Sequence, residues 1–391
     1  MSKRNETTPN VPTLRFKQFQ DNWSSKRLSD IAEVVGGGTP DTTDSTLWNG
    51  GIQWFTPTEV GHSKYVSMSA RTISQLGLQK SSAKILPAGS ILLSSRATVG
   101  ECSITQKDCT TNQGFQNLIP KKGINNEFLY YLAQTQKRHF IKYASGSTFL
   151  EISNSEIKKT KCAVPSIEEQ TEIATFLSAI DRKIEVQNKI ISDLKVLKKE
   201  LCNKVFGKGS AVRLGDFIEE VTTRNKSNNC ENVLSVSNKM GFIKQSEQFE
   251  DRTVASENKS NYKVVTEGCF AYNPARINVG SIALLSTYKI GIISPMYVCF
   301  KTKSALDSEY LNFYYQSGFF YKELQKKLEG SVRQCLTYEN MSEILIPYVG
   351  IEKQKAIATA LNKFATLIAN EEKYLKSLQK QKSYFLSAMF I

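Results

Sequence analysis

Two long stretches of sequence decide the fold of this 391-residue chain. Residues 166–206 read SIEEQTEIATFLSAIDRKIEVQNKIISDLKVLKKELCNKVF, and residues 350–390 read GIEKQKAIATALNKFATLIANEEKYLKSLQKQKSYFLSAMF. After its first residue, neither stretch contains glycine or proline, the residues that most disfavour a helix interior. Apolar residues recur in both at alternating steps of four and three, which is typical of helices that pair as a coiled coil.

The two predicted helices differ in how clearly they begin. In the first, Ser166 is placed to cap the helix and Glu169 completes a capping box three residues later. Gly207 then ends the helix. In the second, Gly350 and Lys353 stand at the corresponding positions, so its start is less clearly marked.

Each helix carries an apolar seam, and the two seams match residue by residue with a separation of 184 positions. Polar residues interrupt both seams at equivalent places, which indicates a duplicated coiled-coil arm. The first seam consists of Ile173, Leu177, Ile180, Ile184, Ile191, Leu194, Leu201 and Val205, interrupted by Gln187 and Lys198. The second consists of Ile357, Leu361, Phe364, Ile368, Leu375, Leu378, Phe385 and Met389, interrupted by Glu371 and Lys382.

The polar seam residues favour antiparallel pairing. A parallel pair in register places Lys198 against Lys382, and burying like charges together is strongly unfavourable. An antiparallel pair instead places Lys198 against Glu371 and Gln187 against Lys382. The same register pairs Ile180 with Met389, Ile184 with Phe385, Ile191 with Leu378, Leu194 with Leu375, Leu201 with Ile368 and Val205 with Phe364. The alternative is that each helix packs only on its own domain, as most amphipathic helices do.

An antiparallel pair also predicts a shape that suits DNA. Residues 171–205 span about 35 positions, or roughly 50 Å at about 1.5 Å per residue. The globular parts are then expected at opposite ends of the pair. Two-fold protein readers match half-sites about one DNA turn apart, ~34–36 Å, so a spacer on this scale suggests two separated DNA segments.

The rest of the chain is duplicated as well. Four short motifs recur in the same order at offsets of about 180–186 residues, far longer than the ~20–50 residues of stacked repeats. The pairs are residues 27–31 with 213–217, 96–100 with 276–280, 146–147 with 330–331, and 167–170 with 351–354. Each half reads as a mixed strand and helix region followed by one long helix.

We therefore predict an α+β fold in which two globular domains, related by a pseudo-two-fold axis, are separated by a long antiparallel two-helix coiled coil. The predicted boundaries are residues 1–165 for the first domain, 166–207 for the first spacer helix, 208–348 for the second domain and 349–391 for the second spacer helix. Within the halves, helical patches are expected over 128–143 and 310–328, and strands over 90–94 and 269–272.

Composition narrows the function. The formal net charge is +14 and the pI is near 9.2, which favours polyanionic partners such as nucleic acid. Two histidines, His62 and His139, and eight cysteines without a C-x-x-C pair argue against a zinc site. The N-terminus lacks the apolar region of a signal peptide, and the apolar window 280–300 favours two buried strands over a membrane span. A reduced, cytoplasmic protein is expected.

The duplicated motifs and the two helices resemble the specificity subunit of type I restriction-modification systems. The likeness covers essentially the whole chain, from the entry at residues 14–16 with Trp23, through the Arg96 and Arg276 motifs and the glycine–serine loops, to the segments that open both helices. Each motif alone is weak, but in duplicate and in order they are specific. Gly350 and Lys353 depart from the family pattern only at the start of the second helix.

The resemblance implies two target-recognition domains, each reading one half of a bipartite asymmetric site in double-stranded DNA. It also implies that the helices set the gap and dock two methyltransferase (modification) subunits, with restriction subunits as further partners. The resemblance then implies that those partner subunits catalyse the reactions, and that this chain binds no cofactor, neither S-adenosylmethionine nor ATP.

Motifs for chemistry within the chain are absent or incomplete. Residues 273–276 (NPAR) lack the second proline and the aromatic residue of an adenine-methyltransferase loop, and the glycines 36–38 lack the spacing of a cofactor turn. No phosphate-binding G-x-x-x-x-G-K-[S/T] motif occurs. No catalytic residue and no metal site is therefore predicted. An enzyme that modifies DNA by itself, and a coiled-coil DNA tether without sequence preference, are the alternative functions.

Candidate DNA contacts are chosen from turns and from the parts where the two halves differ most. Arg96 and Arg276 each follow a strand, where a guanidinium grips a phosphate or a guanine edge; a structural salt bridge is an equal alternative. The two glycine–serine loops offer N–H and hydroxyl groups that donate hydrogen bonds to a phosphate, or they are ordinary loops. Each lysine, taken alone, is more typical of a solvated surface residue. The candidates are Lys64, Arg71, Arg96, Thr98, Ser147, Thr148, Lys239, Lys244, Arg276, Asn278, Ser331 and Arg333.

Overall fold

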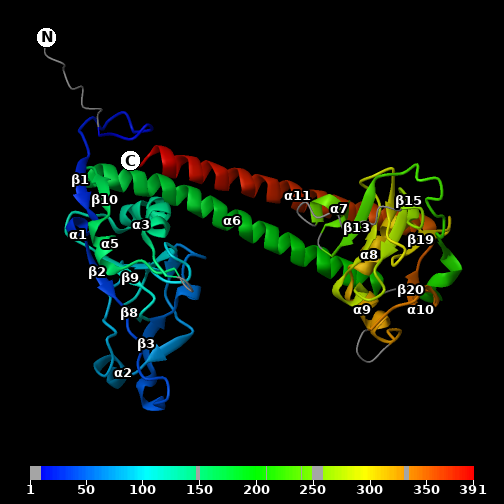
Figure 1. The fold of residues 1–391 in the computed structure, drawn as a ribbon, viewed down its shortest axis with the longest axis horizontal. Coiled ribbons are helices and arrows are strands. Elements are labelled where there is room, and N and C mark those ends of the chain that lie inside the picture. The colour runs from blue at the N-terminus through cyan, green and yellow to red at the C-terminus, as the bar shows by residue number, and fades with distance from the viewer. Residues whose placement is uncertain (1–9, 147–149, 208, 239, 249–258, 330–333) are drawn as a thin grey trace, which may run out of the picture. The chain divides into compact units, whose positions relative to one another are not determined.

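The computed structural model describes residues 10–146, 150–207, 209–238, 240–248, 259–329 and 334–391. The chain forms two compact units, which Figure 1 shows with their elements labelled. Unit 1 comprises Met1–Asn188 and Tyr374–Ile391, and unit 2 comprises Lys189–Lys373. Each unit therefore combines one globular domain with a part of both long helices.

Unit 1 is built on three sheets. Their strand orders are β1-β10, β2-β9-β6-β7-β4 and β5-β3-β8. The strands are β1 (Ser24–Arg27), β2 (Ala32–Gly36), β3 (Trp48–Phe55), β4 (Tyr65–Val66), β5 (Arg71–Ile73), β6 (Ile91–Leu93), β7 (Cys102–Thr105), β8 (Cys109–Thr111), β9 (Gln116–Pro120) and β10 (Lys161–Val164). The helices before the long one are α1 (Leu28–Ile31), η1 (Ser45–Leu47), η2 (Pro57–Glu59), α2 (Gln75–Gln79), α3 (Asn126–Thr135), α4 (Lys137–Tyr143) and α5 (Asn154–Lys159).

Unit 2 is also built on three sheets, with the strand orders β11-β20, β12-β19-β16-β17 and β14-β13-β18-β15. The strands are β11 (Ser210–Arg213), β12 (Ile218–Glu220), β13 (Val233–Ser237), β14 (Gly241–Lys244), β15 (Lys263–Thr266), β16 (Cys269–Tyr272), β17 (Ile282–Leu284), β18 (Ile290–Ile293), β19 (Val298–Thr302) and β20 (Leu345–Tyr348). The shorter helices are η3 (Leu214–Phe217), α7 (Gln245–Gln248), η4 (Ile277–Val279), α8 (Ser308–Tyr315), α9 (Gly318–Gln325) and α10 (Tyr338–Ser342).

The strand orders confirm the duplication. The order β2-β9-β6-β7 in unit 1 recurs as β12-β19-β16-β17 in unit 2, and the pair β1-β10 recurs as β11-β20. In each unit a second sheet contains one parallel pair, β3 with β8 and β13 with β18. The strand predicted over 269–272 is β16, and the helical patches are α3–α4 and α8–α9. The window 280–300 holds β17, β18 and the start of β19, three strands instead of the two expected.

The cores are aromatic and lie against the long helices. In unit 1, Phe390 stacks on Phe128 and Trp23 meets both rings edge-on, so residues near the end of α11 contribute to the first core. In unit 2, Tyr310 and Tyr314 pack on Phe206, the last residue of the first long helix. Among the described residues, no helix has the length and apolarity needed to cross a membrane.

The long helices are α6 (Ile167–Phe206) and α11 (Ile351–Ala388). The Ser166 hydroxyl accepts the Glu169 backbone N–H at 3.3 Å, as the predicted capping box requires. The other half of the box is wrong, because the Glu169 carboxylate is bound to Arg15 through two hydrogen bonds of 2.7 Å. A guanidinium offers a carboxylate two charge-assisted bonds, which a single backbone N–H does not match.

Buried glutamines fix both helix starts in the same way. The Gln170 side chain accepts the Asn125 backbone N–H and donates to the Pro165 carbonyl. Gln354 makes the equivalent contacts, accepting from the Asp307 N–H and donating to the Val349 carbonyl. Asn125 and Asp307 are the N-caps of α3 and α8, so each glutamine ties the start of a long helix to the start of a domain helix.

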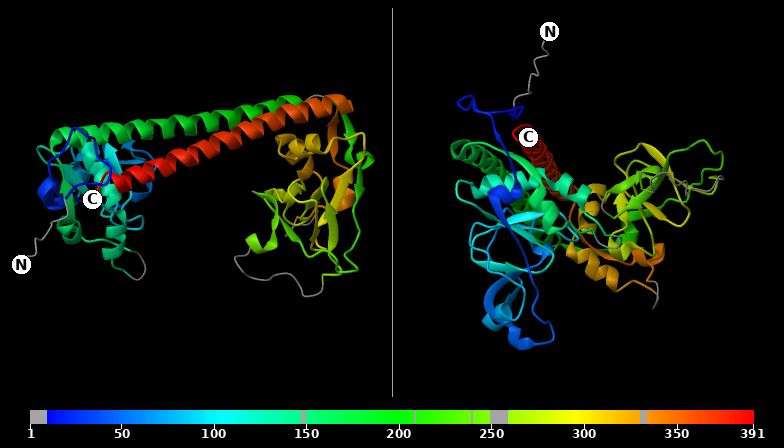
Figure 2. Two further views of the ribbon diagram at one scale, coloured as in Figure 1. Left: turned by 90° about the horizontal axis from the view of Figure 1, so that it is seen from above. Right: turned by 60° about the vertical axis from the view of Figure 1, so that its left-hand side comes forward.

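The predicted seam is confirmed by burial, because every seam position on α6 and α11 is buried or half-buried. Antiparallel packing is visible within unit 1, where Phe385 contacts Phe176 and Lys382 contacts Asp181: the numbers rise along α6 as they fall along α11. Figure 2 shows the C-terminal end of α11, in red, close to the start of α6 in unit 1.

Two seam residues of α11 make side-chain contacts beyond the predicted pairs, which stay a prediction. Lys382, expected against Gln187, forms an ion pair with Asp181 at 2.7 Å. Phe385, expected against Ile184, contacts the ring of Phe176. A half-buried ammonium is better stabilised by a carboxylate than by an amide, and Asp181 lies outside the seam on which the pairing was based.

Lys198 also makes contacts beyond the predicted pair. It was expected to face Glu371, and its ammonium donates to Gln316 Oε1 at 3.2 Å and lies 5.0 Å from the centre of the Phe313 ring. Phe313 lies in α8 and Gln316 is the C-cap of the same helix, so the Lys198 side chain points toward the second globular domain. In the same unit, the neighbouring Lys195 forms an ion pair with Glu372 of α11 at 2.7 Å.

Replacing Arg15 by alanine tests the Glu169 contact. The Glu169 side chain is 2% exposed, and removing its partner leaves a buried carboxylate unpaired, which costs about 3–5 kcal/mol. The free energy of unfolding, measured by urea denaturation, is expected to fall accordingly. The exposed pair Lys355–Glu352 is the control: Lys355→Ala is expected to cost less than about 1 kcal/mol, and equal effects of the two variants would contradict the prediction.

Candidate nucleic-acid interface

Arg96 lies on a turn after β6. The turn is strained, because the next residue, Ala97, has a φ of 63°. The Arg96 backbone bridges Glu151, and its guanidinium Nε lies 3.5 Å from Glu151 Oε2 with about half of each side chain exposed. The Thr98 hydroxyl on the same turn is 3.0 Å from Ser94 Oγ. Arg96 thus has a structural ion pair and still presents N–H groups to solvent.

Arg276 lies at the equivalent turn of unit 2, immediately before η4. Its side chain is exposed, while its carbonyl accepts the backbone N–H groups of Val279 and Ser281. The ion pairs found in the described part of the chain do not include Arg276. Asn278 is exposed on η4 beside it. The second arginine is therefore the freer of the two to bind an external anion or base.

Arg276 lines a cavity of about 400 Å³ in unit 2. Most of the lining is uncharged and polar, and Val279 and Met296 add apolar atoms at its exposed rim. Arginine, asparagine and glutamine are the side chains that bind guanine and adenine edges, and apolar atoms contact the thymine methyl group. The polar lining residues are Ser235, Ser237, Asn238, Gln245, Tyr262, Asn273, Arg276, Ser281, Ser294 and Tyr297. This reading cleft has the chemistry of a base-contacting surface.

Arg71 is exposed on β5, and its guanidinium carbon lies 3.7 Å from the centre of the Trp48 ring. The Trp54 ring is farther away, with its centre 5.6 Å from the same carbon and 5.0 Å from the centre of the Trp48 ring. Stacking holds the guanidinium plane in one orientation while its edge N–H groups remain available to phosphate or base. Lys244 is exposed at the end of β14. Both positions are compatible with DNA contact.

Lys64 has a different environment from the one predicted. Its side chain is 10% exposed, and its ammonium contacts Glu127 Oε2 at 3.0 Å and Ser178 Oγ at 2.5 Å. Burial lowers the pKa of Lys64, although Glu127 opposes that change. These contacts occupy the ammonium within unit 1, which favours a structural role over a DNA contact.

Five candidates lie outside the described residues: Ser147, Thr148, Lys239, Ser331 and Arg333. Gly146, which precedes the first loop, has a φ of 127° that only glycine adopts readily.

No residue group with metal-site chemistry accompanies these surfaces. Within the described ranges, no cluster of three or more histidine, cysteine or acidic side chains is placed to hold an ion. The eight cysteines are free thiols, and burial raises the pKa of several, that of Cys109 to about 11 and that of Cys102 to about 12. Buried thiols with raised pKa values are poor nucleophiles.

Sequence reasoning missed the residues around Lys64. Glu127, Ser178 and Asp181 carry ordinary surface-type side chains on α3 and α6, and no motif singles them out. The buried glutamines Gln170 and Gln354 did recur in the repeated motif, and their conservation between the two halves was the available signal.

The type I restriction modification DNA specificity domain matches this chain twice, over residues 20–196 and 210–380. The chain belongs to the type I restriction-modification specificity-subunit family. It is 40% identical over 189 residues to the type I restriction enzyme MjaIX specificity subunit of Methanocaldococcus jannaschii, covering 47% of this chain and 44% of that one. The chain thus matches less than half the length of this relative.

Two comparisons cover more of the chain. The MjaVIII specificity subunit of the same organism is 23% identical over 337 residues, which is 76% of this chain and 77% of that one. The crystal structure of the type I S subunit from M. genitalium matches with a TM-score of 0.59 at 14% identity, covering 97% of this chain and 99% of that one. The latter likeness supports the specificity-subunit fold.

The half-buried Lys198 gives this specificity subunit a testable pH dependence. Burial lowers the pKa of Lys198, so the folded state holds its proton less tightly than the unfolded state. Stability is therefore reduced at neutral pH and recovers as the pH rises through the lowered pKa toward the unfolded value of about 10.4.

We expect Lys198→Met to raise the free energy of unfolding at pH 7, with the advantage shrinking by pH 10, measured by urea denaturation at both values. Lys195→Met removes an exposed lysine three residues earlier and serves as the control. A gain from Lys198→Met that is the same at both pH values would contradict the assigned cause.

Proposed function

We propose that this specificity subunit recognises DNA sequence without catalysing a reaction, each globular domain reading one half of a bipartite asymmetric site. The observation that carries the proposal is the internal duplication: two domains that share a four-strand order in one sheet, each joined to a long helix. One chain with two different reading surfaces is suited to a site with two different halves. The net charge of +14 supports a DNA partner.

We further propose that the helix pair sets the gap between the half-sites and docks two modification (methyltransferase) subunits. Restriction subunits are further candidate partners. Support comes from the 40 and 38 residues of α6 and α11, which as continuous helices resist bending. Exposed apolar side chains on these helices, including Val186, Val196, Leu197, Leu367 and Tyr374, offer contact area to protein partners.

The experiment that tests this function is co-expression with a candidate methyltransferase subunit, followed by mapping of methylated adenines in the host genome. A bipartite motif with one fixed gap is expected. Methylation without a motif would support the tether alternative, and methylation by this chain in the absence of any partner would support the self-contained enzyme.

The reading cleft predicts that Arg276→Ala relaxes only one half-site. A bidentate arginine–guanine contact is worth about 1–3 kcal/mol of base discrimination. The methylome of the variant complex is therefore expected to keep one half of the motif and to accept additional bases in the other.

Arg213→Ala is a matched control, because Arg213 lies in the same unit but is ion-paired with Glu343. It is expected to leave the motif unchanged. Relaxation of both half-sites by Arg276→Ala would refute the division of labour between the domains.

A further inference from the structure

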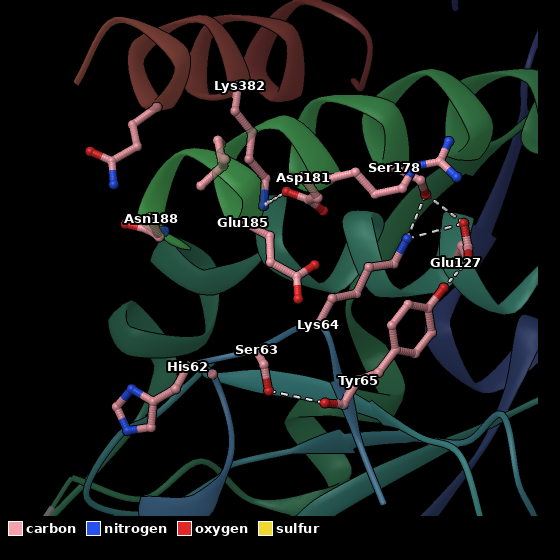
Figure 3. A pocket seen from close by; sticks show the side chains of 14 residues that line it. His62, Ser63, Lys64, Tyr65, Glu127, Ser178, Asp181, Glu185, Asn188 and Lys382 are labelled. Atoms are coloured by element: carbon pink, nitrogen blue, oxygen red, sulfur yellow. Dashed lines mark hydrogen bonds and ion pairs between the residues drawn. The ribbon is translucent and has the colours of Figure 1, made fainter. Parts of the chain in front are cut away.

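A network of charged and hydroxyl side chains joins the first recognition domain to both long helices. Figure 3 shows Lys64 reaching toward Glu127 and Ser178, and Lys382 of α11 reaching Asp181 of α6. All members of the network except Tyr131 line a cavity of about 530 Å³ within unit 1. We call it the docking network; its members are Lys64, Glu127, Tyr131, Ser178, Asp181 and Lys382.

The contacts within the docking network are continuous. Ser178 Oγ donates to Glu127 Oε2 at 2.6 Å, and the Tyr131 hydroxyl donates to Asp181 Oδ2 at 2.5 Å. Lys64 contacts the first pair and also lies 3.2 Å from the Tyr131 hydroxyl. Lys382 closes the far end on Asp181. The segment just before β4, the helix α3 and both long helices are therefore tied together by side chains from four separate parts of the sequence.

Because the network is buried, it contributes more to the orientation of the first domain on the helices than to the stability of the fold. The charged side chains are between 10% and 27% exposed, so much of their attraction is offset by lost hydration. Burial opposes ionisation of Glu127, yet hydrogen bonds from Ser178, Tyr65 and Lys64 keep its pKa lowered. Such groups are satisfied in one arrangement only, because any tilt of the domain leaves a buried charge without its partner.

In unit 2, the position that corresponds to Asp181 carries no carboxylate, although Glu309 on α8 corresponds to Glu127 on α3. The 184-residue repeat aligns Lys382 with Lys198 and Asp181 with Ala365. Lys198 accordingly has a neutral amide, Gln316, and an aromatic ring, Phe313, as its contacts on the second domain. An amide hydrogen bond and a cation–ring contact depend less strictly on direction than a chain of charged hydrogen bonds.

We propose that the docking network fixes the orientation of the first recognition domain on the helix pair, whereas the second domain is held less rigidly. The complex then discriminates between gap lengths mainly through the fixed orientation of the first domain on its half-site. This inference rests on the proposed function. Asp181 and Lys64 are positioning residues in it, because they act through the orientation of the domain and not through contact with DNA.

The loss-of-function test uses the full complex with its methyltransferase and a set of DNA sites whose gap differs by one base pair from the preferred one. Asp181→Asn is nearly isosteric and removes the carboxylate charge that faces Lys382. The preferred gap is expected to be methylated at nearly the normal rate, while the preference over the altered gaps falls about tenfold, equivalent to ~1.4 kcal/mol.

Lys159→Ala is the control for this test. It removes an exposed lysine paired with Glu156 in the same unit and is expected to leave the gap profile unchanged. If Asp181→Asn lowers methylation at every gap by the same factor, the positioning role is overturned.

The gain-of-function test adds the missing carboxylate to unit 2. Ala365→Asp places an acid where the repeat puts Asp181, within the expected reach of Lys198. The preference over the altered gaps is then expected to rise, and it does so even if Asp181→Asn fails to fold. An unchanged profile would overturn the claim that the second domain is the one held less rigidly.

The two proposals fail in different ways. If the wild-type complex methylates all gaps equally, the proposed function is wrong. If the wild type discriminates between gaps but Asp181→Asn and Ala365→Asp keep its profile, only the positioning inference is wrong.

Discussion

Burial of the seam on the long helices is the constraint from which the rest of the structure follows. A helix of 40 residues with an apolar stripe is not stable alone in water, because most helical stability in proteins comes from packing. The stripe is covered partly by the other helix and partly by a domain core. In unit 1, Ile173 and Leu177 enter the same core as Phe128, and in unit 2, Leu361 enters the core around Tyr310. The pairing of the helices and the packing of each domain against them therefore bury the same apolar stripe and depend on each other.

The polar residues within the seam must also be accommodated. An ammonium group in an apolar seam must find a partner or reach solvent. Lys382 finds Asp181, and Lys198 turns to the amide and ring offered by α8. Lys382 thus joins the two long helices, whereas Lys198 joins α6 to the second domain.

Duplication gave the two halves one scaffold and left the surfaces free to diverge. The order β2-β9-β6-β7 recurs as β12-β19-β16-β17, and the buried glutamines at the helix starts make equivalent contacts in both units. The exposed turns differ: Arg96 is paired with Glu151, whereas Arg276 lines a polar cavity. A shared scaffold with different exposed surfaces suits the proposed recognition of a two-part asymmetric DNA site.

The sequence by itself determined the duplication, the two helices, their seam and their antiparallel direction, because these follow from regular spacing and from matched charges such as Lys198 and Lys382. It also placed β16 and the helical patches correctly. Only the tertiary structure decided the partners: that Glu169 binds Arg15, that Lys64 is enclosed in unit 1, and that Lys382 pairs with Asp181. Spacing along one helix reports which face is buried, but a side chain's partner depends on every element that packs around it, and those elements lie far away in the sequence.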